Sequence, residues 1–198
     1  VGIYGGYAGY GAADPDARDV TGNPTILSGD IGTVGSNADN SYHVVVGSGT
    51  DSTAIIDGLS ITAGNASPAS TSGYGGGMYN SAGSPTINAC TFSGNAADSY
   101  GGGMYNQSSS SPTLTNCTFS RNSALDAGGG MYNTASSPTA DNCFFTGNSG
   151  TLGAMANVSG SSPTLRGCAF EGNSGYGLYN YSSSSPVVTN CTFTANTF

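Results

Sequence analysis

The strongest constraint on the fold is a pattern that returns every 23 to 27 residues over most of the chain. Each unit has an apolar residue with Asn two positions later, then a Ser-rich stretch, a Pro, a Cys, a Phe and a second Asn. The prolines mark the period, at Pro85, Pro112, Pro138, Pro163 and Pro186. Self-similarity at such a period indicates a solenoid, in which each unit buries its apolar face against the next.

The composition of the units favours strands over helices. Gly, Ser, Thr, Asn and Pro are abundant, and all are poor in helix interiors. Between Cys117 and Ser120 the apolar Cys and Phe alternate with Thr and Ser, as in a strand with one buried face. We therefore expect an all-β solenoid of 23–27 residues per coil and roughly seven coils, stacked about 4.8 Å apart.

Residues 1–198 are expected to form a single domain. Residues 66–198 hold five clear repeats, and residues 1–65 hold less regular coils in which Leu59 falls in the Cys column and Ile61 in the Phe column. Neither end carries a convincing polar cap, which solenoids need for solubility. We expect the chain to be a piece of something longer, or its ends to be covered by a neighbouring molecule.

In stacked coils, equivalent residues become ladders. Two core ladders are predicted, at Cys90, Cys117, Cys143, Cys168 and Cys191 and at Phe92, Phe119, Phe145, Phe170 and Phe193. An Asn ladder passing amide hydrogen bonds between coils is predicted at Asn95, Asn122, Asn148, Asn173 and Asn196. The cysteines are expected to be buried free thiols, because five in one column, without a CxxC pair, suit neither disulfides nor zinc.

Charge excludes several classes of partner. Only 7% of residues are charged, the net charge is −8, and the basic residues are three arginines. Nucleic acids and anionic membrane surfaces both require basic side chains. No apolar run approaches the roughly 18 residues that would cross a bilayer, so no membrane insertion is expected.

Two motifs resemble a known family. The sequence GGMY, at residues 76–79, 102–105 and 129–132, and an FxxN in each of the five repeats resemble the repeats of polymorphic outer-membrane proteins. The opening residues are similar to the first coils of large bacterial surface proteins with a right-handed parallel β-helix of pectate-lyase-like architecture. The resemblance implies secretion or display on the cell surface. The fourth unit, LGAMAN at residues 152–157, departs from the pattern and predicts a bulge or altered corner.

The same architecture hosts polysaccharide lyases and hydrolases, so catalysis has to be considered. A hydrolase needs two carboxylates facing each other across the scissile bond, but the ionisable residues of the five repeats are scattered. Asp141 and Arg166 share a column in adjacent coils and predict a surface ion pair. The densest acidic cluster, Asp14, Asp16 and Asp19, is a weak candidate for calcium, with a solvated turn as the alternative.

The candidate binding or assembly surface is a strip of outward tyrosines. If Met points inward, alternation turns its neighbour outward, at Tyr79, Tyr105, Tyr132 and Tyr179. The rings could hold sugars, pack against a second molecule or shield the sheet. Outward Thr rows beside the Phe ladder suggest ice binding, but Phe144, Ala169 and Glu171 interrupt them.

These observations favour a non-catalytic, extracellular structural or adhesive β-helix of a bacterial cell-surface protein or fibre. The expected partners are further copies or other surface-protein chains, with a glycan as a further possibility. A carbohydrate-binding or polysaccharide-active β-helix is the alternative. No cofactor is expected unless calcium binds.

Overall fold

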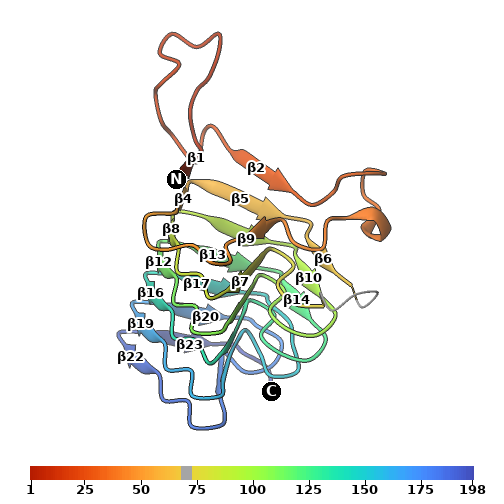
Figure 1. Ribbon diagram of the computed structural model, residues 1–198, viewed down its shortest axis with the longest axis vertical. Coiled ribbons are helices and arrows are strands. Elements are labelled where there is room, and N and C mark those ends of the chain that lie inside the picture. Colours follow the sequence, from red (N-terminus) through yellow and green to blue (C-terminus); the bar gives the residue numbers. More distant parts are fainter. Residues whose placement is uncertain (68–72) are drawn as a thin grey trace.

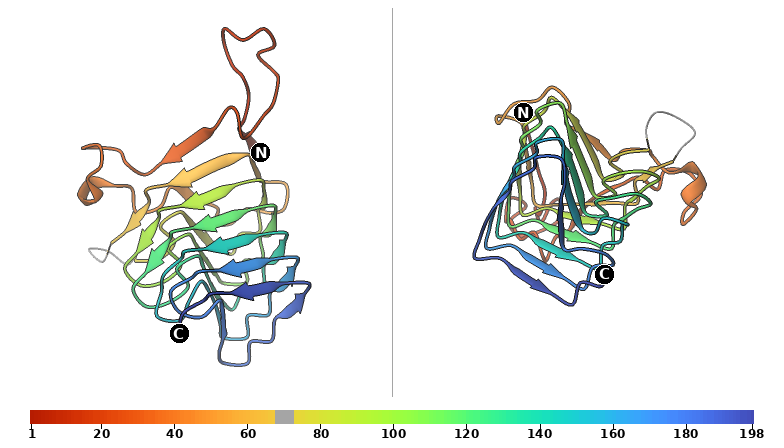
Figure 2. Two further views of the ribbon diagram at one scale, coloured as in Figure 1. Left: turned by 180° about the vertical axis from the view of Figure 1, so that it is seen from behind. Right: turned by 90° about the horizontal axis from the view of Figure 1, so that it is seen from below.

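The computed structural model describes residues 1–67 and 73–198, which form a parallel β-solenoid (Figure 1). Three long sheets run along its axis and enclose a roughly triangular interior when viewed from the end (Figure 2, right). Within the described ranges the helical structure is a single 3-10 turn, η1 (Asn37–Asp39), and no helix is long and apolar enough to span a membrane. The predicted all-β class is confirmed.

The strands fall into three long sheets and one short one. Sheet 1 contains β1 (Gly2–Tyr4), β4 (Ile55–Asp57), β8 (Thr86–Asn88), β12 (Thr113–Thr115), β16 (Thr139–Asp141), β19 (Thr164–Arg166) and β22 (Val187–Thr189). Sheet 2 contains β2 (Thr25–Ser28), β5 (Leu59–Thr62), β9 (Thr91–Ser93), β13 (Thr118–Ser120), β17 (Phe144–Thr146), β20 (Ala169–Glu171) and β23 (Thr192–Thr194). Sheet 3 contains β3 (Val45–Val46), β7 (Met78–Ser81), β11 (Met104–Gln107), β15 (Met131–Thr134), β18 (Met155–Val158) and β21 (Leu178–Asn180). The short sheet contains β6 (Asn65–Ala66), β10 (Ala96–Ala97) and β14 (Ser123–Ala124).

The register places equivalent residues of successive coils opposite one another. Met104 pairs with Met78 on one side and Met131 on the other, and Phe119 pairs likewise with Phe92 and Phe145. Neighbouring Phe rings lie 4.7 to 4.8 Å apart, which matches the spacing of paired strands. Ile61 extends the Phe column into the less regular coils, as predicted.

Inward-facing columns fill the interior, and the predicted core ladders are confirmed in the middle of the chain. Phe92, Phe119, Phe145 and Phe170 are fully buried, and the first four cysteines are at most 1% exposed. At the last coil of the structure the ladders reach the surface: Phe193 is 45% exposed and Cys191 is half-buried.

The predicted Asn ladder is also present. The Asn122 Nδ2 group donates to the Asn148 Oδ1 atom at 3.0 Å and to the Phe92 carbonyl at 2.9 Å. Its Oδ1 atom accepts from the Asn95 side chain and backbone. A second, unpredicted ladder of amide hydrogen bonds runs along sheet 3, with donor–acceptor distances of 2.8 to 2.9 Å, through Asn80, Asn106, Asn133, Asn157 and Asn180.

Glycine is required where each coil turns into sheet 3. Gly101 has a φ of +68°, and a Cβ atom there would lie 2.4 Å from the Met104 carbonyl oxygen. The altered corner predicted for the fourth unit is present, because the Ala154 carbonyl accepts from both Gly130 and Met131. The strand that follows keeps its register, with Met155 opposite Met131.

The expectation of roughly seven coils is slightly too high. About four regular turns are complete, each opened by a four-residue strand of sheet 3 that begins at Met, about 26 residues apart. The first turn has strands in sheets 1 and 2 only, and the second is opened by the two-residue β3. The number of regular turns is lower than expected because two irregular segments take up much of the first 41 residues. They are an arm (residues 5–24) between β1 and β2 and a loop (residues 29–41) between β2 and β3, both visible in Figure 1.

The Asn ladder yields a stability prediction. Asn122→Ala should lower the free energy of unfolding by about 3 kcal/mol or more, because it leaves several buried groups of neighbouring coils without partners. Urea denaturation measures the change. Thr113→Ala, on the exposed face of sheet 1, should stay within about 0.5 kcal/mol of the parent. Equal effects of the two substitutions would contradict the role given to the ladder.

Candidate interaction surfaces

The outward tyrosines of sheet 3 are not an open strip. Tyr105 is 6% exposed and Tyr132 is 9% exposed, while Tyr79 and Tyr179 are half-buried. They belong to an apolar cluster separate from the Met and Phe core. The tyrosines do face away from the Met column, but the prediction of an exposed surface is wrong for the two central rings.

The cover comes from the segment that precedes each glycine corner. Tyr74 stacks on Tyr105 at 4.9 Å, and Tyr100 stacks on Tyr132 at 4.4 Å. The rings therefore form two layers, and the first layer continues through Tyr79 to His43 at 5.1 Å. The sequence signal for the second layer was a Tyr directly before the glycines, as in the sequence YGGGMY at residues 100–105.

Burial changes the acidity of these phenols. Removal from water raises the pKa of Tyr132 to about 12 and raises that of Tyr105 as well, and neighbouring tyrosines act in the same direction. The Tyr105 hydroxyl donates to the Gln107 side chain at 3.3 Å, and Gln107 in turn donates to the Tyr79 hydroxyl. Such a cluster acts as a second small core beside the main one.

Four of the five thiols of the cysteine column are buried. All five cysteines are free, as predicted. Hydrogen bonding to Cys117 and burial raise the pKa of Cys143 to about 12, and burial raises that of Cys90. Thiols of this kind stay protonated at neutral pH, whereas nucleophilic attack and metal binding need the thiolate.

The charged side chains of the described residues include two ion pairs. Arg166 and Asp141 form the predicted surface ion pair at 3.5 Å, and Arg18 of the arm pairs with Asp57 of β4. Over residues 1–67 and 73–198, no three side chains of His, Cys, Asp or Glu lie close enough together to hold a metal ion.

The acidic residues of the arm shape their own turns. The Asp14 carboxylate accepts from the Asp16 backbone at 3.2 Å. The Asp19 carboxylate accepts from the Gly22 and Thr21 backbones, and these hydrogen bonds lower the pKa of Asp19. Asp14 and Asp19 thus make local turn contacts, as in the alternative of a solvated turn, and calcium binding at Asp14, Asp16 and Asp19 stays a weak prediction.

The outer face of sheet 2 carries the interrupted hydroxyl row. Thr91 and Thr118 pair in adjacent coils, but the next positions are Phe144 and Ala169. Phe144 is 54% exposed. The row of outward hydroxyl groups on sheet 2 is thus interrupted, as predicted.

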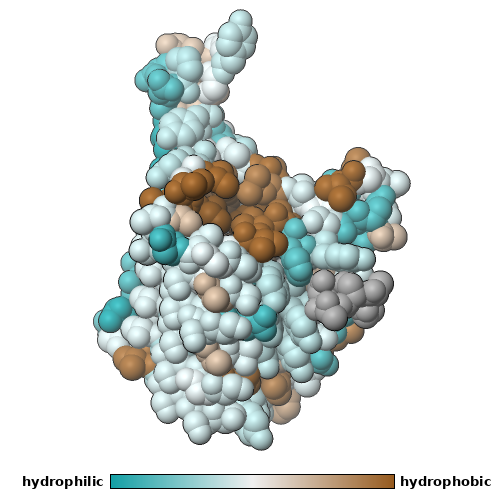
Figure 3. All heavy atoms as spheres, in the orientation of Figure 1, coloured by the Kyte–Doolittle hydropathy of each residue, from teal (hydrophilic) through white to brown (hydrophobic). Residues whose placement is uncertain are grey.

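Apolar surface gathers at the two ends of the solenoid. In the described part of the chain, the large exposed apolar residues lie within residues 1–46 or 176–198, except Leu125 and Phe144. At the first end, a hollow of about 320 Å³ lies beside β3, where the first turn has no strand of sheet 3. Its lining includes Val1, Ile3, Val45, Val46, Ile55 and Met78. Figure 3 shows the apolar surface at this end as a brown patch below the arm.

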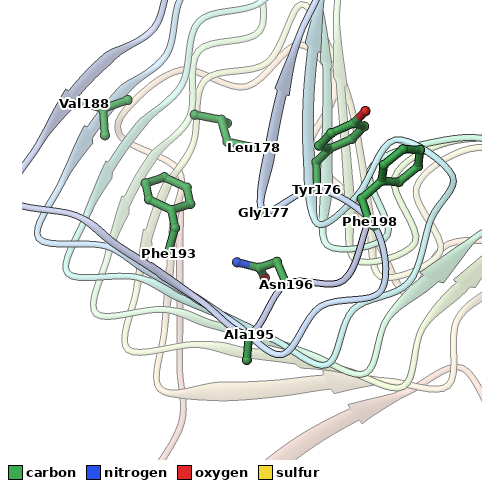
Figure 4. A pocket seen from close by; sticks show the side chains of 9 residues that line it. Tyr176, Gly177, Leu178, Val188, Phe193, Ala195, Asn196 and Phe198 are labelled. Atoms are coloured by element: carbon green, nitrogen blue, oxygen red, sulfur yellow. The ribbon is translucent and has the colours of Figure 1, made fainter.

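At the other end the main core opens to the surface. The hollow there is lined by Leu178, Val188 and Phe193, with Tyr176 and Phe198 stacked at its side (Figure 4). Each of the first three continues an inward column of one long sheet. Both end faces thus combine apolar side chains with the free edges of parallel strands, and such edges are templates for pairing.

The tyrosine cluster predicts that a tyrosine within sheet 3 contributes more to stability than one just beyond the end of that sheet. Tyr105→Ala should lower the free energy of unfolding by about 3–5 kcal/mol, because it removes a buried ring of the first layer that also stacks on Tyr74 of the second. Tyr181→Ala, at a position 65% exposed, should change it by less than about 0.5 kcal/mol. Chemical denaturation of both variants is the measurement, and a small effect at Tyr105 would show that the cluster is not a core.

Alkaline pH should weaken the fold through the same cluster. The pKa of Tyr132 is about 12 when folded and about 10 when unfolded, so its neutral form is favoured by folding. This contribution is complete below pH 10 and is lost as the pH rises from 10 to 12. Unfolding free energies across that range should fall less steeply in Tyr132→Phe. Tyr10→Phe, at the exposed tip of the arm, should follow the parent; identical slopes for all three proteins would refute the assignment.

Comparison with known proteins identifies the family. The family described as right handed beta helix region matches residues 26–151 and again residues 124–198. Among curated proteins and among solved structures, no protein matches the chain. The two matched segments together span most of the chain and coincide with the stacked coils of the three sheets. The chain therefore belongs to the right-handed β-helix family.

Proposed function

We propose that this β-helix is a non-catalytic structural element of an extracellular bacterial surface protein or fibre, and that it associates with further copies through its end faces. The observation that carries the proposal is the concentration of exposed apolar residues and free strand edges at the two ends. Between the ends, the repeating positions are taken by the Phe, Asn and Tyr ladders, whose side chains pack against the neighbouring coils. A rigid body with adhesive ends suits a structural role.

The resemblance of the GGMY and FxxN motifs to polymorphic outer-membrane protein repeats supports the extracellular setting. Low charge and a net charge of −8 are compatible with it. A carbohydrate-active β-helix has less support. It would need converging carboxylates, and two of the acidic residues, Asp57 and Asp141, are paired with arginines instead.

The particle mass in solution tests this proposal. The 198-residue polypeptide should exceed its monomer mass of 19.5 kDa in light scattering, increasingly so at higher concentration. Val46→Lys at one end and Phe198→Lys at the other should each return it towards the monomer, because a buried lysine without a partner is costly.

The matched control is Phe144→Lys, which changes an exposed apolar residue on the outer face of sheet 2, between the two ends. It should leave the mass distribution unchanged. A parent polypeptide that stays monomeric at every concentration would overturn the proposal. Equal dissociation by Phe144→Lys would show that association does not use the ends.

A further inference from the structure

The arm (residues 5–24) is a hairpin that projects from the first end of the solenoid. It extends beyond β1 and β2 along the direction in which the coils stack (Figures 1 and 2). Its two limbs are joined by backbone hydrogen bonds, from Ala8 to the Ala17 carbonyl at 2.9 Å and from Asp19 to the Gly6 carbonyl at 2.7 Å. Residues 10–22 are nevertheless all exposed. An isolated two-stranded hairpin is marginally stable in water, so this one is suited to a surface that a partner supplies.

The base of the arm is fixed to the outer side of sheet 1, at the corner where sheet 1 turns into sheet 2. The Arg18 guanidinium pairs with the Asp57 carboxylate, and its Nε group donates to the Gly5 carbonyl at 2.9 Å. Asp57 follows the buried Ile56 in β4, so strand alternation turns the Asp57 side chain outward. The return limb of the arm therefore lies along the outer column of sheet 1 that contains Asp57.

An arginine occupies the same outer column close to the last end. Strand pairing along sheet 1 makes this column from Tyr4, Asp57, Asn88, Thr115, Asp141, Arg166 and Thr189. Arg166 lies one coil from β22, the last strand of the sheet, and its side chain is 59% exposed. It therefore offers a positive charge on the surface beside the last end.

A second copy that continues the solenoid on the first end would carry this column past the arm. Its last strands, β22 and β23, would pair with β1 and β2, which are the edge strands of sheets 1 and 2 at that end. The inward columns match, since Val188 would meet Ile3 and Phe193 would meet Leu27. Arg166 of the second copy would then lie two coils beyond β1, about 10 Å along the axis.

We propose that the arm of one copy lies along the outer corner of a second copy, with the Asp16 carboxylate facing Arg166 of that copy. Asp16 is exposed and precedes Arg18 by two residues on the return limb, so it lies about 7 Å further from the base in an extended chain. The long Arg166 side chain spans the remaining distance, and the two charges are complementary. The contact exists only if copies associate through their end faces, as proposed above.

Light scattering of charge-reversed variants over a range of concentrations tests the contact. Arg166→Asp and Asp16→Arg should each raise the concentration at which half of the polypeptide is associated by about threefold or more, because like charges replace an ion pair. The double variant should return towards the parent value. Since Asp16→Arg also lowers the net negative charge, general repulsion between copies would not explain a weaker association of that variant.

The matched control is Arg121→Asp, which makes the same charge change at an exposed arginine just after β13 in sheet 2, at the end of that strand away from the corner. It should alter the half-association concentration less than about 1.5-fold. Circular dichroism verifies that each variant folds. If the parent associates but Arg166→Asp behaves like Arg121→Asp, or the double variant is not restored, the arm contact is overturned and association through the end faces stands. A parent that stays monomeric at every concentration would overturn both.

Discussion

The structure depends on one interaction, the pairing of each coil with the next at the spacing of parallel strands. Two contacts repeat at that interval. The centroids of neighbouring Phe rings lie 4.7 to 4.8 Å apart, and the hydrogen bonds between Asn side-chain amides are 2.8 to 3.0 Å long. A residue in any column must therefore suit identical neighbours above and below it. Flat rings stack on themselves, and an amide can donate on one side and accept on the other, which explains why Phe and Asn recur where they do.

The same rule leaves little of the long faces for other chemistry. Tyrosines that a single sheet would have exposed are covered by Tyr74 and Tyr100, which reach across to rings of the next coil. Ala127 and Ala156, where tyrosine is missing from the pattern, are both fully buried in that cluster. What remains available are the two end faces and the irregular segments of the first turns.

Much of this fold could be predicted, because the chain can be aligned with itself. The positions of Cys90, Phe92 and Asn95 in their unit predicted three columns that the structure contains. The cover over the tyrosines could not be predicted in this way. Tyr100 stacks on Tyr132, which is not the equivalent position of the next repeat, and the segment that carries Tyr100 varies in length from coil to coil. The arm at residues 5–24 and the loop at residues 29–41 each occur once. Repetition reveals ladders, and unique loops give no such signal.

The two Asn ladders also have a direction. In every coil the Nδ2 group donates towards the following coil, and in one ladder a backbone carbonyl fixes that orientation. The amide dipoles therefore align along the axis. The ladder of sheet 3 begins at the buried Asn80, beneath β3, and ends at Asn180 in the last strand of that sheet. Because every amide points the same way, the two ends of the solenoid are not equivalent, so a filament built from such units would be polar and would grow by joining unlike faces.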